Sequence, residues 1–262
     1  MRIFIITMDD PVQTKDFIKH IIKERKDQII GLAVPNGDRL TLSKGKSKYE
    51  YLLSLLLIMG LYHFLKNVFI SVLHKVKKKA HKFNLVKDPT IMGYAKENNI
   101  PTHKINTPNG KNFREKLMKL KPDIIINQSQ SIIKKELLDI PTIGVLNRHN
   151  ALLPKNRGRL TPFWVLFKEE EETGVSIHFV EEGLDSGDII VQKKYKVGKK
   201  ESFNSLVKKN YKIAPKAMLE AIGLLESKQN ELIPNNDDLA TYNSTPSLKE
   251  AWSYRLKKMG RF

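Results

Sequence analysis

The sequence contains no cysteine. This absence excludes disulfide bonds, cysteine-ligated zinc, iron–sulfur clusters and thiol nucleophiles. A Gly-x-Gly-x-x-Gly fingerprint and a P-loop are also missing, which argues against NAD and ATP as ligands. His63, His74 and His81 lack metal-ligand spacing and have lysine neighbours, so no metal site is predicted.

Long apolar runs are scarce as well. The N-terminal run Ile3–Thr7 is too short for a secretory signal and predicts a buried strand. The most apolar stretch, residues 51–76, is interrupted from His63 onward, after about a dozen residues, whereas a membrane-spanning helix needs about 20. A cytoplasmic protein is therefore expected, with membrane association as the alternative.

Basic residues are plentiful: 46 Lys and Arg face 28 Asp and Glu, a net charge of +18. Such a charge attracts nucleic acid, anionic lipid or phosphorylated substrates. Because the basic residues are spread over most of the chain, we favour the simpler interpretation that lysine covers the surface. Segment 51–82 ends in a lysine cluster, and three interpretations of it are possible. It is a buried helical insertion, a helix of a homodimer, or a peripheral helix lying on an anionic membrane.

Apolar runs and helical patterns alternate along most of the chain, which predicts an α/β fold with a mostly parallel sheet. A helical insertion at about 47–85 interrupts this alternation. A long helix is expected at 202–227, and a polar C-terminal extension covers 229–262. The expected strands are 2–7, 28–34, 102–105, 124–126, 141–146, 175–180 and 189–195.

Two polar clusters follow predicted strands. In the first, residues 147–158, Asn147 and His149 alternate, so their side chains point the same way. The second, residues 181–188, contains Asp185 in a glycine-rich turn. An amide and a protonated imidazole can stabilise a developing oxyanion, while a carboxylate orients the imidazole. No serine or cysteine is placed beside them as a nucleophile.

The motifs in these clusters resemble the folate-dependent formyltransferase family, which includes glycinamide ribonucleotide, methionyl-tRNA and amino-sugar formyltransferases. The resemblance is strong over about 120–195 and weaker over 1–50, and it excludes 51–90 and the residues after about 228. In size and layout the chain is most similar to the sugar N-formyltransferases. The matching motifs are Asn147-Arg148-His149, Leu152-Leu153-Pro154-Lys155-Asn156-Arg157-Gly158, Ser176-Ile177-His178 and Leu184-Asp185-Ser186-Gly187.

The resemblance implies a Rossmann-like, doubly wound formyltransferase domain over residues 1–228, with N10-formyltetrahydrofolate as the formyl donor. It assigns catalysis to Asn147, His149 and Asp185. The first two would stabilise the oxyanion, and Asp185 would keep His149 protonated and assist proton transfer. It places the pterin against two segments whose backbone and apolar side chains would bind it: Gln130, Ser131, Ile132, Ile133 and Leu138, and Val180, Glu181, Glu182, Gly183 and Leu184.

The acceptor is expected to be a small-molecule amine. The loop after the first strand places Asp9 and Asp10 on the acceptor side, but its carboxylates and Pro11 disfavour a phosphate there. We expect a nucleotide-linked amino sugar, with Arg157 meeting the diphosphate. Methionyl-tRNA is the alternative acceptor, although the tRNA enzymes carry a further C-terminal domain for which little chain remains after Tyr195. A non-catalytic protein bound to membrane or nucleic acid is a further alternative.

Overall fold

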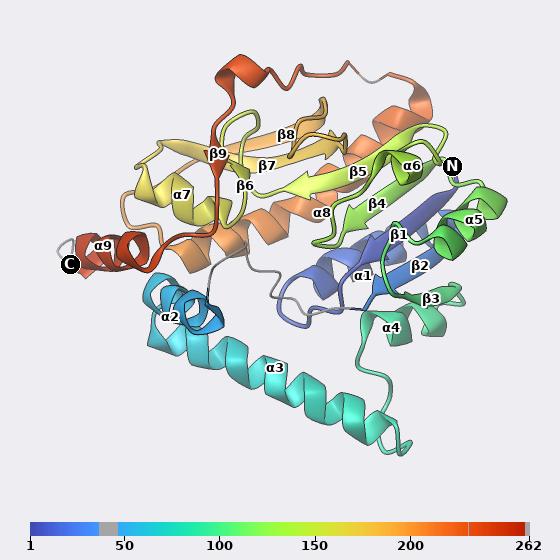
Figure 1. Ribbon diagram of the computed structural model, residues 1–262, viewed down its shortest axis with the longest axis horizontal. Coiled ribbons are helices and arrows are strands. Elements are labelled where there is room, and N and C mark those ends of the chain that lie inside the picture. Colours follow the sequence, from blue (N-terminus) through green and yellow to red (C-terminus); the bar gives the residue numbers. More distant parts are fainter. Residues whose placement is uncertain (37–46, 230, 260–262) are drawn as a thin grey trace.

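A seven-stranded sheet runs through the centre of the computed structural model, which describes residues 1–36, 47–229 and 231–259 (Figure 1). Its strand order is β3-β2-β1-β4-β5-β7-β8. The strands are β1 (Ile3–Thr7), β2 (Ile29–Pro35), β3 (Thr102–Ile105), β4 (Ile124–Gln128), β5 (Gly144–His149), β7 (Glu172–Phe179) and β8 (Ile189–Lys196).

The strand directions confirm the predicted fold class. The first five strands in this order pair in parallel, whereas β7 and β8 are antiparallel to their neighbours. The central strands β1 and β4 are continuous runs of buried, mainly isoleucine side chains. Such runs are typical of parallel strands that helices cover on both faces.

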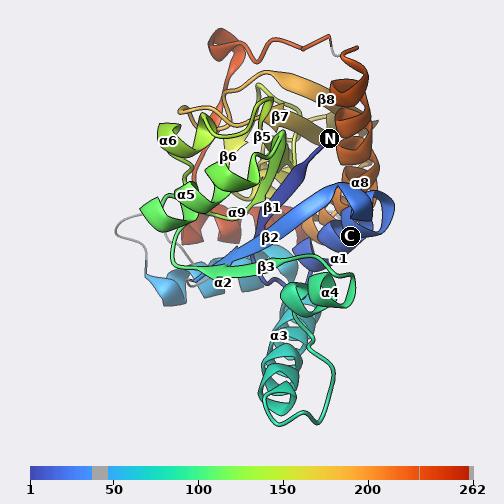
Figure 2. The same ribbon diagram turned by 90° about the vertical axis from the view of Figure 1, so that its right-hand side faces the viewer.

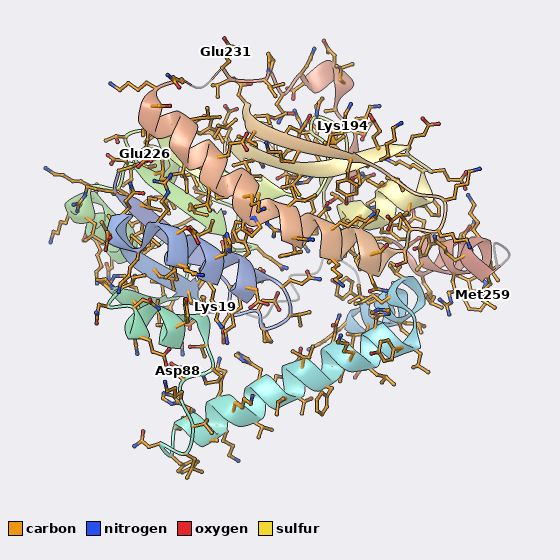
Figure 3. The ribbon with its side chains drawn as sticks, turned by 180° about the vertical axis from the view of Figure 1, so that it is seen from behind. Lys19, Asp88, Lys194, Glu226, Glu231 and Met259 are labelled. Atoms are coloured by element: carbon orange, nitrogen blue, oxygen red, sulfur yellow. The ribbon has the colours of Figure 1, made fainter. Side chains whose placement is uncertain are left out.

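Helices cover both faces of the sheet (Figure 2). On one face, α1 (Thr14–Arg25) and α8 (Phe203–Ser227) pack side by side and bury Ile18 and Ala217 among a large aliphatic cluster. Figure 3 shows these two helices across the back of the molecule. On the other face, α5 (Lys111–Leu120) and α6 (Lys135–Leu138) cover a second cluster. The shorter helices α4 (Ile91–Glu97) and α7 (Thr161–Phe167) complete the domain.

Two helices lie in the segment assigned to the insertion. The first, α2 (Lys48–Met59), packs against α9 (Leu248–Met259) and α8, whereas α3 (Leu61–His81) extends along one side of the molecule (Figure 1). No helix in the described part of the chain combines the length and apolar character that crossing a bilayer requires.

The polar C-terminal segment folds back onto the domain. Its short strand β9 (Tyr242–Asn243) pairs in parallel with β6 (Arg157–Gly158), at the end of the first polar cluster. Gly158 has φ +108°, and a Cβ there would lie 2.1 Å from the carbonyl oxygen of Asn243, so this pairing requires glycine.

Candidate active site

The carboxyl end of β5 carries the first two candidate residues. Asn147 and His149 share one face of the strand, and antiparallel β7 places His178 opposite Asn147 and Ser176 opposite His149. His149 is buried, and Asn147 is half-buried. The strand pairing therefore gathers an amide, two imidazoles and a hydroxyl on one face of the sheet.

Asp185 reaches this face by a route that the sequence did not indicate. Because β7 is antiparallel to β5, its carboxyl end pairs with Leu146 rather than with His149, and residues 180–188 must return along the sheet. A Cβ at Gly187 would lie 2.3 Å from the carbonyl oxygen of Phe179, so the return requires glycine. The loop places Asp185 Oδ2 3.5 Å from His149 Nδ1. The three candidate residues thus converge, although not because their strands end at the same edge.

Both ring nitrogens of His149 face acceptors. Nε2 lies 2.8 Å from the carbonyl oxygen of Asn156, and Nδ1 faces the Asp185 carboxylate. An imidazolium has an N–H on each ring nitrogen and can donate toward both acceptors. Asp185 is itself fixed, because its Oδ2 accepts a 2.9 Å hydrogen bond from the backbone N–H of Gly158.

A side chain that sequence reasoning missed orients Asn147. Gln128, at the end of β4, donates a 3.0 Å hydrogen bond from Nε2 to Asn147 Oδ1. Its own Oε1 accepts from Arg148 Nε at 2.8 Å, which fixes the Gln128 amide. Asn147 therefore directs its donor nitrogen, not its oxygen, toward His178, whose Nε2 lies 3.5 Å away. The signal in the sequence was a polar Asn-Gln pair ending a buried strand beside β5.

His178 is held as a neutral side chain. Its Nδ1 donates to the carbonyl oxygen of Phe179 at 2.7 Å, which leaves Nε2 to accept from Asn147. Burial lowers the pKa of His178 to about 4; the Asp185 charge opposes this shift, whereas His149 and Arg157 add to it. A neutral His178 accepts a hydrogen bond without adding positive charge to the site.

The buried imidazole predicts a pH-dependent stability. An unfolded histidine titrates near 6.5, so between pH 6.5 and about 4 the unfolded chain binds a proton that folded His178 excludes. The contribution of His178 to the free energy of unfolding should therefore be complete above pH 6.5 and be lost as pH falls toward 4, by about 3 kcal/mol.

Urea denaturation of the wild type and of His178→Gln at pH 7 and 5 measures this contribution. The variant should lose less stability on acidification, whereas His63→Gln, at an exposed histidine, should match the wild type. Equal pH slopes in wild type and H178Q would contradict the assignment.

The two segments expected to hold a pterin lie together on the α5 and α6 side of the sheet. Ile133 is buried in the cluster on that face, and Leu138 and Val180 pack against the same cluster. The intervening residues leave apolar side chains exposed, with Ile132 80% and Leu184 56% accessible. Gln130, Glu181, Glu182 and Gly183 are exposed and Ser131 is half-buried. The arrangement offers an apolar wall beside Asn147 and backbone groups around it.

The two acidic residues expected on the acceptor side have structural contacts. Asp9 accepts hydrogen bonds from His74 at 3.0 Å and Lys78 at 2.9 Å, which attach α3 to the end of β1. Burial raises the pKa of Asp9, but the hydrogen bonds from His74 and Lys78 outweigh it, and the net pKa lies below its usual value. Asp10 accepts from the backbone N–H groups at the start of α1, those of Val12, Gln13 and Thr14.

Arg157 does not face the solvent, as a diphosphate contact would require. It is 1% exposed, and its guanidinium donates to Asp237 at 2.6 Å, to the Tyr242 hydroxyl and to Asn235. In this geometry Arg157 holds the C-terminal segment, and its contact with an acceptor diphosphate stays a prediction. Sequence reasoning could not separate a phosphate-binding arginine from one whose partners lie about 80 residues further along the chain.

The same C-terminal segment also holds the loops of the candidate site. Asn235 Nδ2 donates to the carbonyl oxygens of Asp185 at 2.8 Å and Gly187 at 2.9 Å. Asn243 donates at 2.7 Å to Asn156, the residue whose carbonyl faces His149. Nothing in the polar composition of this segment distinguished these asparagines from surface residues. They fix both acceptors that position His149.

A family profile described as formyl transferase matches residues 54–222. The match includes most of segment 51–90, which the motifs alone had left outside the resemblance. The chain is 37% identical over 139 residues to the methionyl-tRNA formyltransferase of Syntrophus aciditrophicus, covering 53% of this chain and 44% of that protein. It is 34% identical over 180 residues to that of Prochlorococcus marinus strain MIT 9215, covering 67% and 53%. The chain thus spans about half the length of these relatives.

Solved structures share the fold at lower identity. An N-formyltransferase from Helicobacter canadensis, in complex with folinic acid and dTDP-3-aminofucose, has a TM-score of 0.59 at 18% identity, covering 93% of this chain and 71% of that one. The phosphoribosylglycinamide formyltransferase from Anaplasma phagocytophilum has a TM-score of 0.60 at 13% identity, covering 93% and 98%. At such identities these likenesses establish the fold.

Proposed function

Because this chain belongs to the formyl transferase family, we propose that it transfers a formyl group from N10-formyltetrahydrofolate to a primary amine. The observation that carries the proposal is the convergence of three residues from separate segments. Asn147 and His149 end one strand, and Asp185 returns from beyond another to lie 3.5 Å from His149. An amide, an imidazole and a carboxylate in this order suit attack by an amine on a carbonyl carbon.

The chain's own residues would act on the formyl oxygen and on the amine proton. Asn147 Nδ2 carries two protons, so one can face His178 while the other donates to the formyl oxygen as charge develops there. His149, as an imidazolium between Asn156 and Asp185, supplies positive charge beside that oxygen. Asp185 accepts the proton that the amine loses as the new carbon–nitrogen bond forms. When bound, the folate supplies the formyl carbon, and its departing nitrogen takes up the returned proton.

The residues beside the site fit a folate. Ile133, Leu138 and Val180 form an apolar wall, and the exposed Ile132 and Leu184 can cover the faces of a flat ring. Exposed loop backbone at 181–183 supplies hydrogen-bonding groups for the ring edge. Helicobacter canadensis N-formyltransferase, which shares this fold, was solved with folinic acid.

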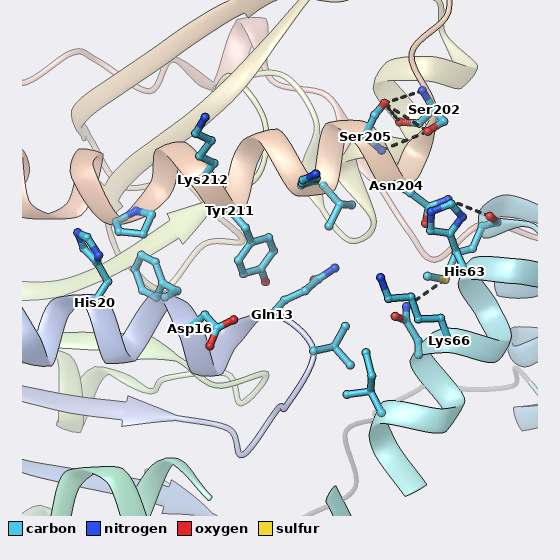
Figure 4. A pocket seen from close by; sticks show the side chains of 18 of the residues that line it. Gln13, Asp16, His20, His63, Lys66, Ser202, Asn204, Ser205, Tyr211 and Lys212 are labelled. Carbon is cyan, nitrogen blue, oxygen red and sulfur yellow. Dashed lines mark hydrogen bonds between the residues drawn. The ribbon is translucent and has the colours of Figure 1, made fainter. Parts of the chain in front are cut away.

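A basic cleft supports an anionic acceptor (Figure 4). It has a volume of about 830 Å³ and lies between α1, α3 and α8. Tyr211 lines it and accepts a 2.9 Å hydrogen bond from Arg148, whose side chain leaves β5 on the face opposite to Asn147 and His149. Asp16 is the one carboxylate among its described lining residues. Four lysines and two histidines also line the cleft: Lys66, Lys208, Lys212, Lys216, His20 and His63. This charge favours a diphosphate, so we propose a nucleotide-linked amino sugar as the acceptor.

Methionyl-tRNA is the second candidate acceptor. The relatives that share the highest identity reported above are methionyl-tRNA formyltransferases, and the net charge of +18 suits a polyanion. Binding of tRNA would neutralise several phosphates, so it should weaken steeply with salt. A single nucleotide diphosphate should show a much shallower salt dependence.

The experiment that tests the proposal is a donor-turnover assay. The full chain is mixed with N10-formyltetrahydrofolate and, separately, with a panel of nucleotide-linked amino sugars, methionyl-tRNA or glycinamide ribonucleotide. Release of tetrahydrofolate with one amino sugar supports the proposal. Release with methionyl-tRNA alone would assign the second acceptor, and no release with any amine despite folate binding would contradict formyl transfer to these classes.

The cleft lysines yield a prediction about the acceptor. Lys66 on α3 and Lys212 on α8 line the cleft and form no ion pair within the described residues. The variant Lys66→Gln/Lys212→Gln should raise KM for a nucleotide-linked amino sugar by at least about tenfold, since each loses a charge-assisted hydrogen bond. Steady-state kinetics should show unchanged kcat and unchanged KM for the folate. The matched pair Lys111→Gln/Lys119→Gln on α5 should behave as wild type, and an unaltered acceptor KM in the cleft variant would exclude the cleft.

A further inference from the structure

The two helices of the insertion differ in how they are packed. Helix α2 contacts α8 and α9, and its Ile58 is buried in a cluster with Trp164 and Tyr254. Helix α3 contributes one buried side chain, His74, and lies along the periphery in both views (Figures 1 and 2). Packing within the domain therefore explains the apolar residues of α2, the first half of segment 51–76. It does not explain the apolar residues of α3, the second half.

An apolar stripe runs along α3. Its members recur every three or four residues, which places them on one face of a helix. Each of them is at least 44% exposed, and Phe69 and Tyr62 beside the stripe are 65% and 70% exposed. The stripe consists of Leu61, Leu65, Val68, Val72 and Val76.

The rotation of α3 about its axis is fixed by the opposite face. His74 is buried and lies 3.0 Å from Asp9, which also accepts from Lys78 at 2.9 Å. Because Asp9 lies in the loop that directly follows β1, this contact ties the inner face of α3 to the end of the sheet. The stripe is consequently held toward the surroundings and cannot turn inward without breaking a partly buried ion pair.

Lysines occupy the outward face of α3 at the C-terminal end of the helix. Lys75, Lys79 and Lys82 follow the stripe on its side of the helix and are exposed. From Leu61 to His81 there is no Asp or Glu. Two copies pairing along α3 would thus place these lysines against a helix that has no carboxylate to meet them. Anionic lipid headgroups supply that charge, and acyl chains accept the stripe.

We propose that α3 binds the surface of an anionic bilayer, lying in the plane of the interface. The stripe enters the boundary between headgroups and acyl chains, and the exposed aromatic rings of Tyr62 and Phe69 lie at headgroup level. The lysine cluster adds electrostatic attraction to the same leaflet. This binding is independent of formyl transfer.

The test is co-sedimentation of the full chain with vesicles, which requires no turnover. Vesicles of phosphatidylcholine with about a third phosphatidylglycerol should retain the protein, and pure phosphatidylcholine should retain at least about tenfold less. The triple variant Leu65→Gln/Val68→Gln/Val72→Gln should lose at least about tenfold in partitioning. Lys75→Gln/Lys79→Gln/Lys82→Gln should lose a similar factor on anionic vesicles only.

Matched controls separate these effects from general changes in surface and folding. Met118→Gln/Leu256→Gln removes exposed apolar side chains elsewhere, and Lys111→Gln/Lys119→Gln/Lys121→Gln removes three other lysines; both should bind as wild type. Thermal denaturation should show unchanged Tm for all variants, since the altered side chains are exposed. Vesicle binding that persists in the stripe variant, or no binding at all, would overturn the proposal. A solution dimer that the stripe variant converts to monomer would assign the stripe to a second copy instead.

Discussion

The variant His149→Ala is expected to lower kcat for formyl transfer by about 10³-fold, equivalent to about 4 kcal/mol of transition-state stabilisation. The loss follows from position, because His149 Nδ1 lies 3.5 Å from Asp185 Oδ2 and His149 shares one face of β5 with Asn147. Alanine removes the imidazole from between these two groups. Tetrahydrofolate release at saturating donor and acceptor measures the effect.

A matched histidine supplies the control for this result. His103 lies on edge strand β3 and contacts Lys116, away from the candidate site. His103→Ala should retain kcat within about twofold, although both variants remove an imidazole. A His149→Ala enzyme that keeps more than a tenth of wild-type kcat would refute its assigned role. An equal loss in both variants would point to unfolding rather than chemistry.

The second large effect concerns stability. Arg157→Ala is expected to reduce the free energy of unfolding by about 3 kcal/mol, because it removes a fully buried guanidinium and leaves the buried Asn235 acceptors unpaired. Urea denaturation at pH 7 measures the change. The surface arginine Arg114, paired with Glu136 at 3.6 Å, offers a matched control whose alanine variant should lose less than about 1 kcal/mol.

Kinetics of the same variant distinguish the two roles considered for Arg157. A residue that binds the acceptor would raise the acceptor KM while leaving stability intact. A residue that holds the C-terminal segment would lower stability and, through Asn235 and the turn at Asp185, lower kcat. Arg157→Lys should recover little of either, since lysine lacks the planar fork that reaches Asn235, Asp237 and Tyr242 together. Unchanged stability with a raised acceptor KM would restore the original expectation.

The elements that could be predicted from sequence are those encoded locally. Continuous isoleucine runs indicated β1 and β4, and helical spacing indicated α1 and α8, so the fold class was confirmed. Alternation along β5 placed Asn147 and His149 on one face, as the structure shows. The spacing of the motifs, rather than any single residue, indicated the family.

What sequence could not provide depends on contacts between distant segments. The antiparallel direction of β7 is set by its pairing with β5 and β8. The residues of the turn around Asp185 therefore could not indicate that the chain runs back along the sheet there. Hydrophobicity alone predicted one apolar helical segment for α2 and α3. In the structure α2 packs against α9, whereas α3 lies at the periphery. Arg157 carries the same formal charge whether it faces a diphosphate or Asn235. In each case the deciding partner lies far along the chain.

The hydrogen bonds from Asn235 that hold the turn at Asp185 have a consequence for synthesis on the ribosome. All seven strands of the main sheet are complete once Lys196 has emerged, but Asn235 and Asn243 follow later. A nascent chain can therefore assemble its sheet while the turn at Asp185 is still unclamped and Gly158 has no strand partner. Since domains form as their segments become available, competence for chemistry should arise later than the fold itself. The candidate site is therefore complete only after the segment around Asn235 and Asn243 docks.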